Sequence, residues 1–342
     1  MLLDLSTVSL PWLGVAFALA GVVILLAGTR LAHRADRIAD QTGIGEALAG
    51  AVFLGATTSL PGTIVSVVSA GFGHTELAIS NAIGGIAAQT AFLGLADIAY
   101  RRANLEHAAA SFTNLTQGAL LVVLLAIPLV AASAPSLAVL GVSPATVALV
   151  AAYVFGLRLS AKARAEPMWR PRDTAETEID VPDEAAGRPG WRSWLALGLL
   201  AACAAASGFA LAETAVEISR KTGLSEGAMG AIFTAVTTSM PELVTSIAAV
   251  RQGALTLAVG GIIGGNAFDV LFLAFADVAY RDGSIYHTMT QHHVFMVALS
   301  IVMTGTLLLG LLRRETHGIG GIGFESSLIL VLYAAAVVVV LG

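Results

Sequence analysis

The sequence has little charge, few aromatic residues and one cysteine. Of its 342 residues, 12% are charged and 6% aromatic. A single cysteine excludes an internal disulfide framework, and we expect Cys203 to be a small packing residue in an apolar helix. The N-terminus has no basic region and no cleavage site of a secretory signal, so the first apolar run is expected to be a retained span. A soluble domain carries about 25% charged residues, so the composition excludes an ordinary soluble domain.

The sequence contains long apolar runs with few charges. Hydrophobic residues make up 56% of the chain, and runs of about 20 residues are each long enough to cross the hydrocarbon core of a bilayer. The sequence predicts an all-α polytopic membrane protein. Its ten transmembrane helices are expected at 10–30, 43–71, 76–99, 110–133, 136–157, 193–215, 224–250, 255–279, 290–312 and 323–341.

One long hydrophilic segment, residues 160–192, divides the chain into two five-helix parts, 1–159 and 193–342. Membrane proteins keep an excess of Lys and Arg on the cytoplasmic side. With this linker in the cytoplasm, 15 Lys and Arg residues lie inside and 3 outside. We therefore expect both termini outside the cytoplasm, in a plasma membrane of bacterial type.

The two parts are related in sequence. Residues 42–101 align with 222–281 without a gap, and 25 of the 60 positions are identical. An odd number of spans in each part means that the second copy is inserted upside down. Such inverted-topology repeats are typical of secondary transporters, which bind their substrate near the bilayer midplane.

A polar patch, TTSMPELVTS (237–246), interrupts one predicted span. Thr238 and Glu242 are four residues apart and share a helix face, with Ser239 beside them. Pro241 removes a backbone donor and frees a carbonyl oxygen. The next span carries Asp269 near the same depth. Hydroxyl, carbonyl and carboxylate oxygens are ligands for hard cations such as Na⁺ or Ca²⁺, so the pattern predicts a cation site.

TTSMPELVTS and GGIIGGNAFDV resemble the repeat signatures of the cation/calcium exchanger superfamily, which includes sodium/calcium exchangers. The counterparts in the first part are TTSLPG and SNAIGGIAAQ, so the two motif regions are 55–89 and 235–269. The resemblance implies cation ligands at Thr58, Ser59, Gln89, Thr238, Ser239, Glu242 and Asp269, with backbone carbonyls from Gly55 and Ala235. Gln89 replaces an asparagine of the family pattern.

Three further positions depart from that pattern. Gly62 replaces a glutamate, and Gly85 and Gly265 replace serines. We expect weaker divalent binding, fewer bound ions or a different cation as a result. The sequence leaves open whether Na⁺ or H⁺ is the coupling ion, and it leaves the oligomeric state open.

The resemblance implies a secondary antiporter, not an enzyme, that exchanges Na⁺ or H⁺ against Ca²⁺ or a related cation by alternating access. The alternative is a transport-inactive, cation-binding relative that acts as a sensor or assembly partner. The expected partners are metal cations and the lipid bilayer, with no cofactor and no nucleic acid.

Two other groups of charged residues have simpler interpretations. Asp97 and Asp277 each precede an arginine by four residues, which favours an ion pair with Arg101 or Arg281 at a helix end; the alternative is a place in an ion vestibule. His74 and Glu76 lie in a turn, where they are solvated or serve as entrance ligands.

Overall fold

The computed structural model describes residues 3–42, 55–100, 103–165, 169, 171–172, 174, 189–316, 318 and 322–342. Within these residues the regular structure is helical, apart from one isolated bridge between Val139 and Val142. The first half contains α1 (Leu10–Thr42), α3 (Leu60–Gly71), α4 (Thr75–Ala99), α5 (Leu105–Ala109), α6 (Phe112–Ser133) and α7 (Pro144–Ala165).

The second half begins with α8 (Trp191–Thr222), followed by a segment of changing helical type. This segment comprises α9 (Glu226–Ala228), the π-helix η1 (Met229–Thr234), α10 (Ala235–Thr238) and α11 (Met240–Arg251). The chain continues with α12 (Leu255–Asp269), α13 (Leu271–Ala279), the 3₁₀-helix η2 (Ile285–Thr288), α14 (Gln291–Arg313) and α15 (Phe324–Leu341).

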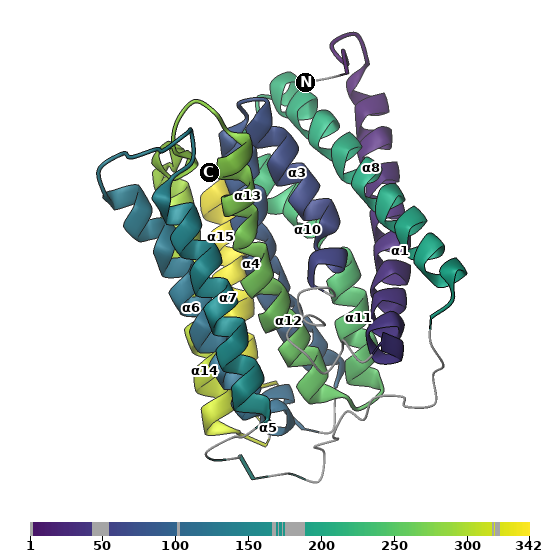
Figure 1. Cartoon of the computed structure of the whole chain (residues 1–342), viewed down its shortest axis with the longest axis vertical. Coiled ribbons are helices and arrows are strands. Elements are labelled where there is room, and N and C mark those ends of the chain that lie inside the picture. Colours follow the sequence, from purple (N-terminus) through teal and green to yellow (C-terminus); the bar gives the residue numbers. More distant parts are fainter. Residues whose placement is uncertain are drawn as a thin grey trace.

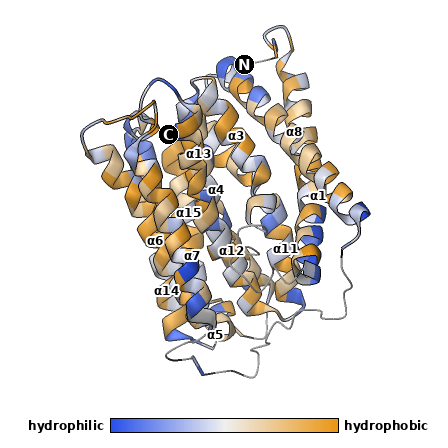
Figure 2. Ribbon diagram, viewed as in Figure 1, coloured by the Kyte–Doolittle hydropathy of each residue, from blue (hydrophilic) through white to orange (hydrophobic). Residues whose placement is uncertain are grey.

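Eight of the described helices are long and apolar enough to cross a bilayer, and a ninth candidate span is bent by 45° between Glu226–Thr238 and Met240–Arg251. α3 is apolar but shorter. Part of the predicted span 43–71 lies outside the described residues. Most of the length of the long helices is coloured as hydrophobic in Figure 2. The chain is an integral membrane protein.

The helix bounds repeat along the chain. α3 and α11 both cover 12 residues and start at Leu60 and Met240. The 25 residues of α4 start at Thr75, and α12 with α13 covers the same length from Leu255. α1 and α8 end at Thr42 and Thr222. The bounds of each pair are related by the same shift that aligns the two halves in sequence.

α4 and the α12–α13 segment form the interior of the bundle. In their most apolar stretches 83% and 72% of the residues are buried, against 22% for α1 and 28% for α8. α1 and α8 pack against each other along one side, and α6, α7, α14 and α15 lie on the other (Figure 1). Both labelled chain ends lie at the same end of the bundle, and α5 lies at the opposite end (Figure 1).

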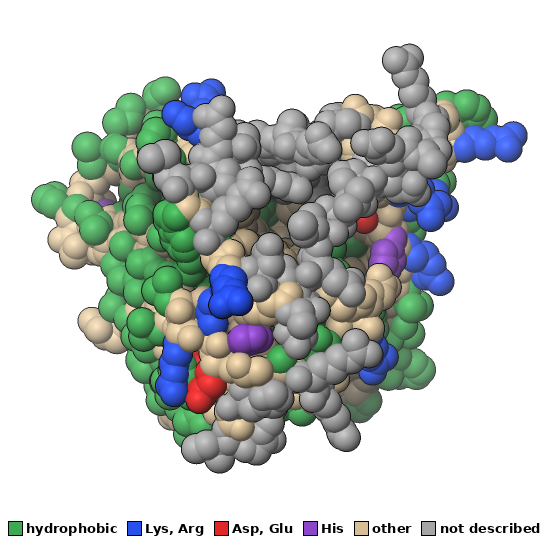
Figure 3. Space-filling model, turned by 90° about the horizontal axis from the view of Figure 1, so that it is seen from below, with side chains coloured by type: hydrophobic (Ala, Val, Ile, Leu, Met, Phe, Trp, Pro, Cys, Tyr) green, Lys and Arg blue, Asp and Glu red, His purple; other side chains and the backbone are tan. Residues whose placement is uncertain are grey.

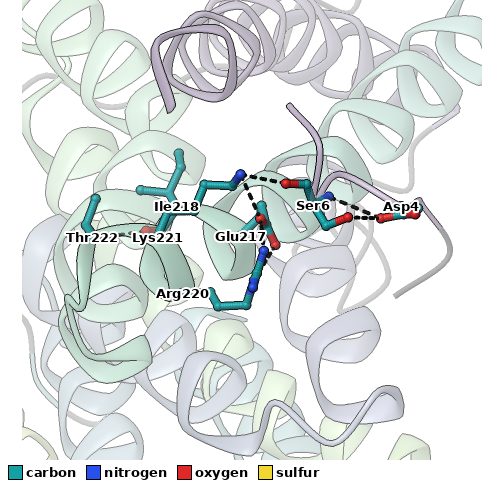
Figure 4. A network of polar contacts seen from close by, with 7 residues as sticks. All are labelled: Asp4, Ser6, Glu217, Ile218, Arg220, Lys221 and Thr222. Carbon is teal, nitrogen blue, oxygen red and sulfur yellow. Dashed lines mark hydrogen bonds and ion pairs between the residues drawn. The ribbon is translucent and has the colours of Figure 1, made fainter. Parts of the chain in front are cut away.

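Polar contacts fasten the N-terminal segment to the last turns of α8 (Figure 4). Lys221 Nζ donates to the carbonyl oxygen of Ser6 at 2.7 Å, and Arg220 donates two hydrogen bonds to Glu217. The Asp4 carboxylate accepts from Ser6 Oγ at 2.6 Å. The start of the chain and the end of α8 are therefore held together.

Several sequence-based expectations need correction. The predicted span 136–157 is displaced to Pro144–Ala165, because residues 134–143 form a loop in which Leu140 and Gly141 have positive φ angles of 56° and 78°. Cys203 is exposed on α8 and is not a packing residue.

The two repeat-related aspartates accept hydrogen bonds from loop residues. Asp97 accepts from the backbone N–H groups of Leu105 and Gly323. Asp277 accepts from Ser143 N, Thr146 Oγ1 and Ile285 N at 2.6–2.9 Å. The expected ion pair of Asp277 with Arg281 is wrong, since the Arg281 guanidinium donates to a carbonyl oxygen of the 134–143 loop. Arg101 lies outside the described residues.

Candidate cation site

Two broken helices place the polar motifs inside the bundle. The break before α11 lies at Ser239, where φ is −93° and ψ is 3°, and Pro241 follows in the first turn. The break before α3 lies at Ser59, with φ −85° and ψ 6°, and Pro61 follows in the same way. Proline cannot donate a backbone hydrogen bond, so a helix interrupted here exposes backbone and hydroxyl oxygens. Both serines are buried.

Glu242 and Asp269 lie at opposite ends of neighbouring helices, and neither faces lipid. Glu242 is in the first turn of α11 and 8% exposed, and Asp269 ends α12 and is 2% exposed. A common hydrogen-bond partner, Gln89, joins Asp269 to Ser239, which lies three residues before Glu242. A helix N-terminus favours negative charge, which suits Glu242. The structure brings together the two acids that the sequence analysis selected.

Gln89 links the two halves at this point. Its Nε2 donates to Asp269 Oδ2 at 2.6 Å and to Ser239 Oγ at 3.1 Å. The neighbouring glycines face the same groups: a Cβ on Gly85 would lie 3.5 Å from Ser239 Oγ, and a Cβ on Gly265 would lie 3.3 Å from Gln89 Oε1. The glycines that replace the family's serines therefore border this site, and they contribute no hydroxyl to it.

Several oxygens of the site are buried without a hydrogen-bond partner. They are Ser59 Oγ, Gln89 Oε1, Glu242 Oε2, Asp269 Oδ1 and the nearby Asn266 Oδ1. An unsatisfied buried polar group costs about 1–3 kcal/mol, so such a concentration of free oxygens calls for an electropositive occupant. A hard cation or ordered water meets this need.

The two threonines make local hydrogen bonds. Thr238 Oγ1 donates to the carbonyl oxygens of Thr234 and Ala235, and Thr58 Oγ1 donates to that of Gly55 at 3.3 Å. A hydroxyl that donates keeps its lone pairs, so both threonines can still face a cation. Thr58 also neighbours the Glu242 carboxylate.

The carbonyl oxygens of Gly55 and Ala235 are engaged in this structure. Gly55 O accepts from Ser59 N at 3.0 Å and from the Thr58 hydroxyl, and Ala235 O accepts from Ser239 N at 3.1 Å and from the Thr238 hydroxyl. A carbonyl oxygen has two lone pairs. Direct ligation by either carbonyl therefore requires one of these bonds to be replaced.

Within the described part of the chain, no three His, Cys, Asp or Glu side chains come together in a way that could hold a metal ion. This site has two carboxylates. A cation bound here would have to complete its shell with the hydroxyls of Ser59, Ser239, Thr58 and Thr238, the Gln89 oxygen or water.

The sequence analysis missed Asn81, which holds three elements together near the site. Its Nδ2 donates to the carbonyl oxygen of Gly62 at 3.1 Å and to Ser66 Oγ at 3.0 Å, and its Oδ1 accepts from Thr234 Oγ1 at 2.8 Å. Asn81 lies in the quoted motif SNAIGGIAAQ, but a single sequence does not distinguish a residue that joins helices from one that binds a cation.

His74 and Glu76 contact α9, at the start of the broken helix, and these contacts do not involve residues of the site. His74 Nδ1 lies 2.7 Å from Glu226 Oε1, and Glu76 Oε1 accepts from the backbone N–H of Gly227 at 3.1 Å. Both contacts connect the start of α4 to α9. The structure thus gives these two residues a bridging role between the halves.

Comparison with known proteins places these motifs in a family. The family model described as sodium/calcium exchanger protein matches residues 12–160 and 192–342. The inner membrane protein YrbG of Escherichia coli (strain K12) is 28% identical over 264 residues, which cover 76% of this chain and 78% of YrbG. CaxA of Alkalimonas amylolytica is 35% identical over 130 residues, and this match spans 37% of the chain and 40% of CaxA.

Solved structures share the fold. The crystal structure of the H⁺/Ca²⁺ exchanger CAX superposes with a TM-score of 0.69 at 15% identity, covering 96% of this chain and 84% of CAX. The sodium-calcium exchanger NCX_Mj, soaked with 10 mM Na⁺ and zero Ca²⁺, superposes with a TM-score of 0.63 at 21% identity, covering 95% and 98%. At these identities the likeness concerns the fold.

Proposed function

We propose that this chain, which belongs to the sodium/calcium exchanger protein family, is a secondary antiporter that exchanges Na⁺ or H⁺ against Ca²⁺ or a related cation. The observation that carries the proposal is the pair of buried carboxylates, Glu242 and Asp269, surrounded by oxygens that lack hydrogen-bond partners. Carboxylates compensate the charge of a cation that loses its hydration shell inside a membrane. Family membership favours transport over the alternative of an inactive sensor.

The proposed architecture is ten transmembrane helices in two inverted repeats, 1–159 and 193–342, joined by a cytoplasmic linker at 160–192. The recurrence of the helix bounds in the second half supports the repeat. Antiparallel α1 and α8 (Figure 1) support the inversion. Alternating access then follows from movement of the α1–α8 pair against the helices that hold the site.

The proposed orientation puts both termini outside the cytoplasm. Figure 3 shows several Lys and Arg side chains on the face seen from below, at the end of the bundle away from the termini, whereas Arg220 and Lys221 lie beside the N-terminal segment. An excess of positive charge marks the cytoplasmic side. A plasma membrane of bacterial type fits this arrangement.

The proposed ligands are Glu242, Asp269, Thr238, Ser239, Thr58, Ser59 and Gln89, with Gly55 and Ala235 available if their carbonyl oxygens exchange partners. Glu242 and Asp269 supply the charge, and the uncharged groups supply the remaining oxygens. The burial and the free oxygens of this donor set support the assignment. The ions themselves are cargo, and no resident cofactor is part of the proposal.

The test is transport in proteoliposomes. Purified protein is reconstituted, a Na⁺ or pH gradient is imposed, and uptake of ⁴⁵Ca²⁺ is compared between wild type and Glu242→Gln. We expect the substitution to reduce uptake at least tenfold, because it removes one of the two negative charges. Glu315→Gln is the matched control, since Glu315 pairs with Arg313 outside the site. Uptake that is unchanged in Glu242→Gln would refute the assigned site.

A further inference from the structure

The charge of the site comes from one half of the chain. In the alignment of the two halves, Glu242 corresponds to Gly62 and Asp269 corresponds to Gln89, and both counterparts are uncharged. The other buried acids of the described residues interact elsewhere: Asp277 with Ser143, Asp97 with Gly323, Glu106 with Ser326 of α15 and with Glu325, and Glu213 with the N-terminal segment. Among the described residues, the carboxylates of Glu242 and Asp269 are therefore the two that border the site.

An aromatic ring occupies the position where a third acid would stand. A Cβ on Gly62 would lie 2.7 Å from Phe272 Cε2 and 3.2 Å from Phe272 Cζ, and 3.5 Å from Thr238 Oγ1. Real Cβ atoms essentially never approach another heavy atom within 3.0 Å. The ring of Phe272 therefore leaves no room at position 62 for a residue larger than glycine.

Other aromatic side chains hold this ring in place. Phe272 is buried and packs edge-on against Phe268, with the ring centroids 6.3 Å apart. Phe268 in turn contacts Tyr153 at 6.1 Å and Phe275 at 6.3 Å. Close-packed side chains yield little space without strain. Phe272 is therefore a fixed wall on the first-half side of the site.

Charge neutrality then sets the number of ions. An uncompensated charge in the low-dielectric interior of a membrane protein is costly, so the number of carboxylates limits the number of monovalent cations that the site can carry. A charge of −2 is balanced by one divalent cation or by two monovalent cations. A third monovalent ion would find neither a carboxylate nor space beside Phe272.

We infer that Gly62 and Phe272 limit the site to two carboxylates, so that one divalent cation exchanges for two monovalent cations and no net charge crosses the membrane. This inference rests on the proposed antiport. It assigns Phe272 as the residue that fixes the ratio of exchanged ions and keeps the transport independent of membrane potential.

The first test measures charge movement in wild type. Proteoliposomes with a fixed Na⁺ gradient (and, separately, a fixed pH gradient) are clamped at 0 and −100 mV with K⁺ and valinomycin, and the final accumulation ratio of ⁴⁵Ca²⁺ is measured. We expect the ratio to change less than twofold. Transfer of one net charge per cycle would change it about 50-fold, because one charge across 100 mV corresponds to about 2.3 kcal/mol. A change of that size would overturn the inference.

The second test asks whether the ring of Phe272 excludes a side chain at position 62. Gly62→Glu is expected to lower both thermal stability and Ca²⁺ uptake, and Gly62→Glu combined with Phe272→Ala is expected to recover at least part of both. The matched control combines Gly62→Glu with Phe92→Ala, since Phe92 is the repeat counterpart of Phe272, and it should recover neither. Thermal stability reveals the clash with Phe272 even if the Gly62→Glu variant is too unstable for transport measurements.

Two outcomes of the second test would contradict the assigned role of Phe272: a Gly62→Glu variant as stable and active as wild type, or a double variant no better than Gly62→Glu. The outcomes for the two proposals differ. If wild type moves no Ca²⁺ under any gradient, the proposed antiport fails. If it moves Ca²⁺ together with net charge, only the present inference fails.

Discussion

Gly28 of α1 packs directly on Pro241, the proline that follows the break before α11. A Cβ on Gly28 would lie 2.5 Å from Pro241 Cγ. The equivalent contact recurs in the other half, since a Cβ on Gly208 of α8 would lie 2.7 Å from the carbonyl oxygen of Pro61. Each helix of the α1–α8 pair therefore touches the broken helix of the other half, next to the site. Any movement of α1 and α8 relative to the broken helices must therefore change these two contacts.

Replacement of either glycine should abolish transport in a protein that still folds. Gly28→Val and Gly208→Val put side-chain atoms into the proline contacts, and we expect at least a tenfold loss of Ca²⁺ uptake. The controls are Gly14→Val and Gly198→Val on the same two helices, where an added Cβ meets nothing within 4 Å. Uptake in proteoliposomes at matched protein density is the measurement. Equal activity of all four variants would show that these contacts play no part.

Gln89→Leu should weaken cation binding. The substitution removes the donor to Asp269 Oδ2 and the free amide oxygen of the site. A hydrogen bond to a charged group contributes about 1.5–3 kcal/mol, so we expect the dissociation constant of Ca²⁺ to rise by about 10- to 100-fold. Isothermal titration gives this constant, and the exposed Gln252 provides the control Gln252→Leu. Unchanged affinity would remove Gln89 from the donor set.

Glu106 should make the protein less stable at high pH. Burial, with Asp97 and Glu325 nearby, raises the pKa of Glu106 well above its ordinary value. A raised pKa in the folded state means that folding favours the protonated form, so stability falls as pH rises from the unfolded pKa through the folded one. Glu106→Gln should then raise the unfolding temperature at pH 8, by about 2–4 °C for each ~1 kcal/mol, and change it little at pH 4.

Thermal unfolding in detergent at the two pH values checks this prediction. Glu315→Gln, at a more exposed acid, serves as the control and should show no such pH dependence. The prediction fails if Glu106→Gln destabilises the protein equally at both pH values.

Asn81→Leu should destabilise the protein more than Asn266→Leu. Asn81 makes three side-chain hydrogen bonds that join α3, α4 and η1, whereas Asn266 donates one, to Thr90. Loss of buried partners costs about 1–3 kcal/mol for each group left unsatisfied. Thermal unfolding of the two variants provides the comparison, and equal shifts would show that the clamp contributes little.

Much of the fold follows from hydropathy, and the exceptions have identifiable causes. The predicted spans 110–133 and 290–312 match α6 and α14 closely. α1 continues to Thr42, well beyond the predicted end at residue 30, because the run of charged residues after Leu26 is compatible with a helix outside the hydrocarbon. The apolar residues of the 134–143 loop were counted as membrane-spanning, since hydropathy does not detect the positive φ angles of Leu140 and Gly141.

The sequence indicated the two acids of the candidate site but not the side chains that surround them. Glu242 and Asp269 were selected from charge and helical spacing, and the structure places both inside the bundle. The hydrogen bond from Gln89 to Asp269 and the wall formed by Phe272 depend on contacts between residues of different halves, far apart in the sequence. No local pattern encodes such contacts, so a phenylalanine in an apolar helix gives no sign that it lies beside the candidate site.

The pairing of Gln89 with Asp269 depends on having both halves in one chain. The two residues are counterparts, and they meet where the halves adjoin. Two identical subunits would put the same side chain on both sides of this meeting point, and two aspartates would face each other as acceptors without a donor. Once both halves are encoded in one gene, each can mutate alone, and an amide can stand opposite an acid. A single chain thus permits chemical combinations that two identical subunits cannot form.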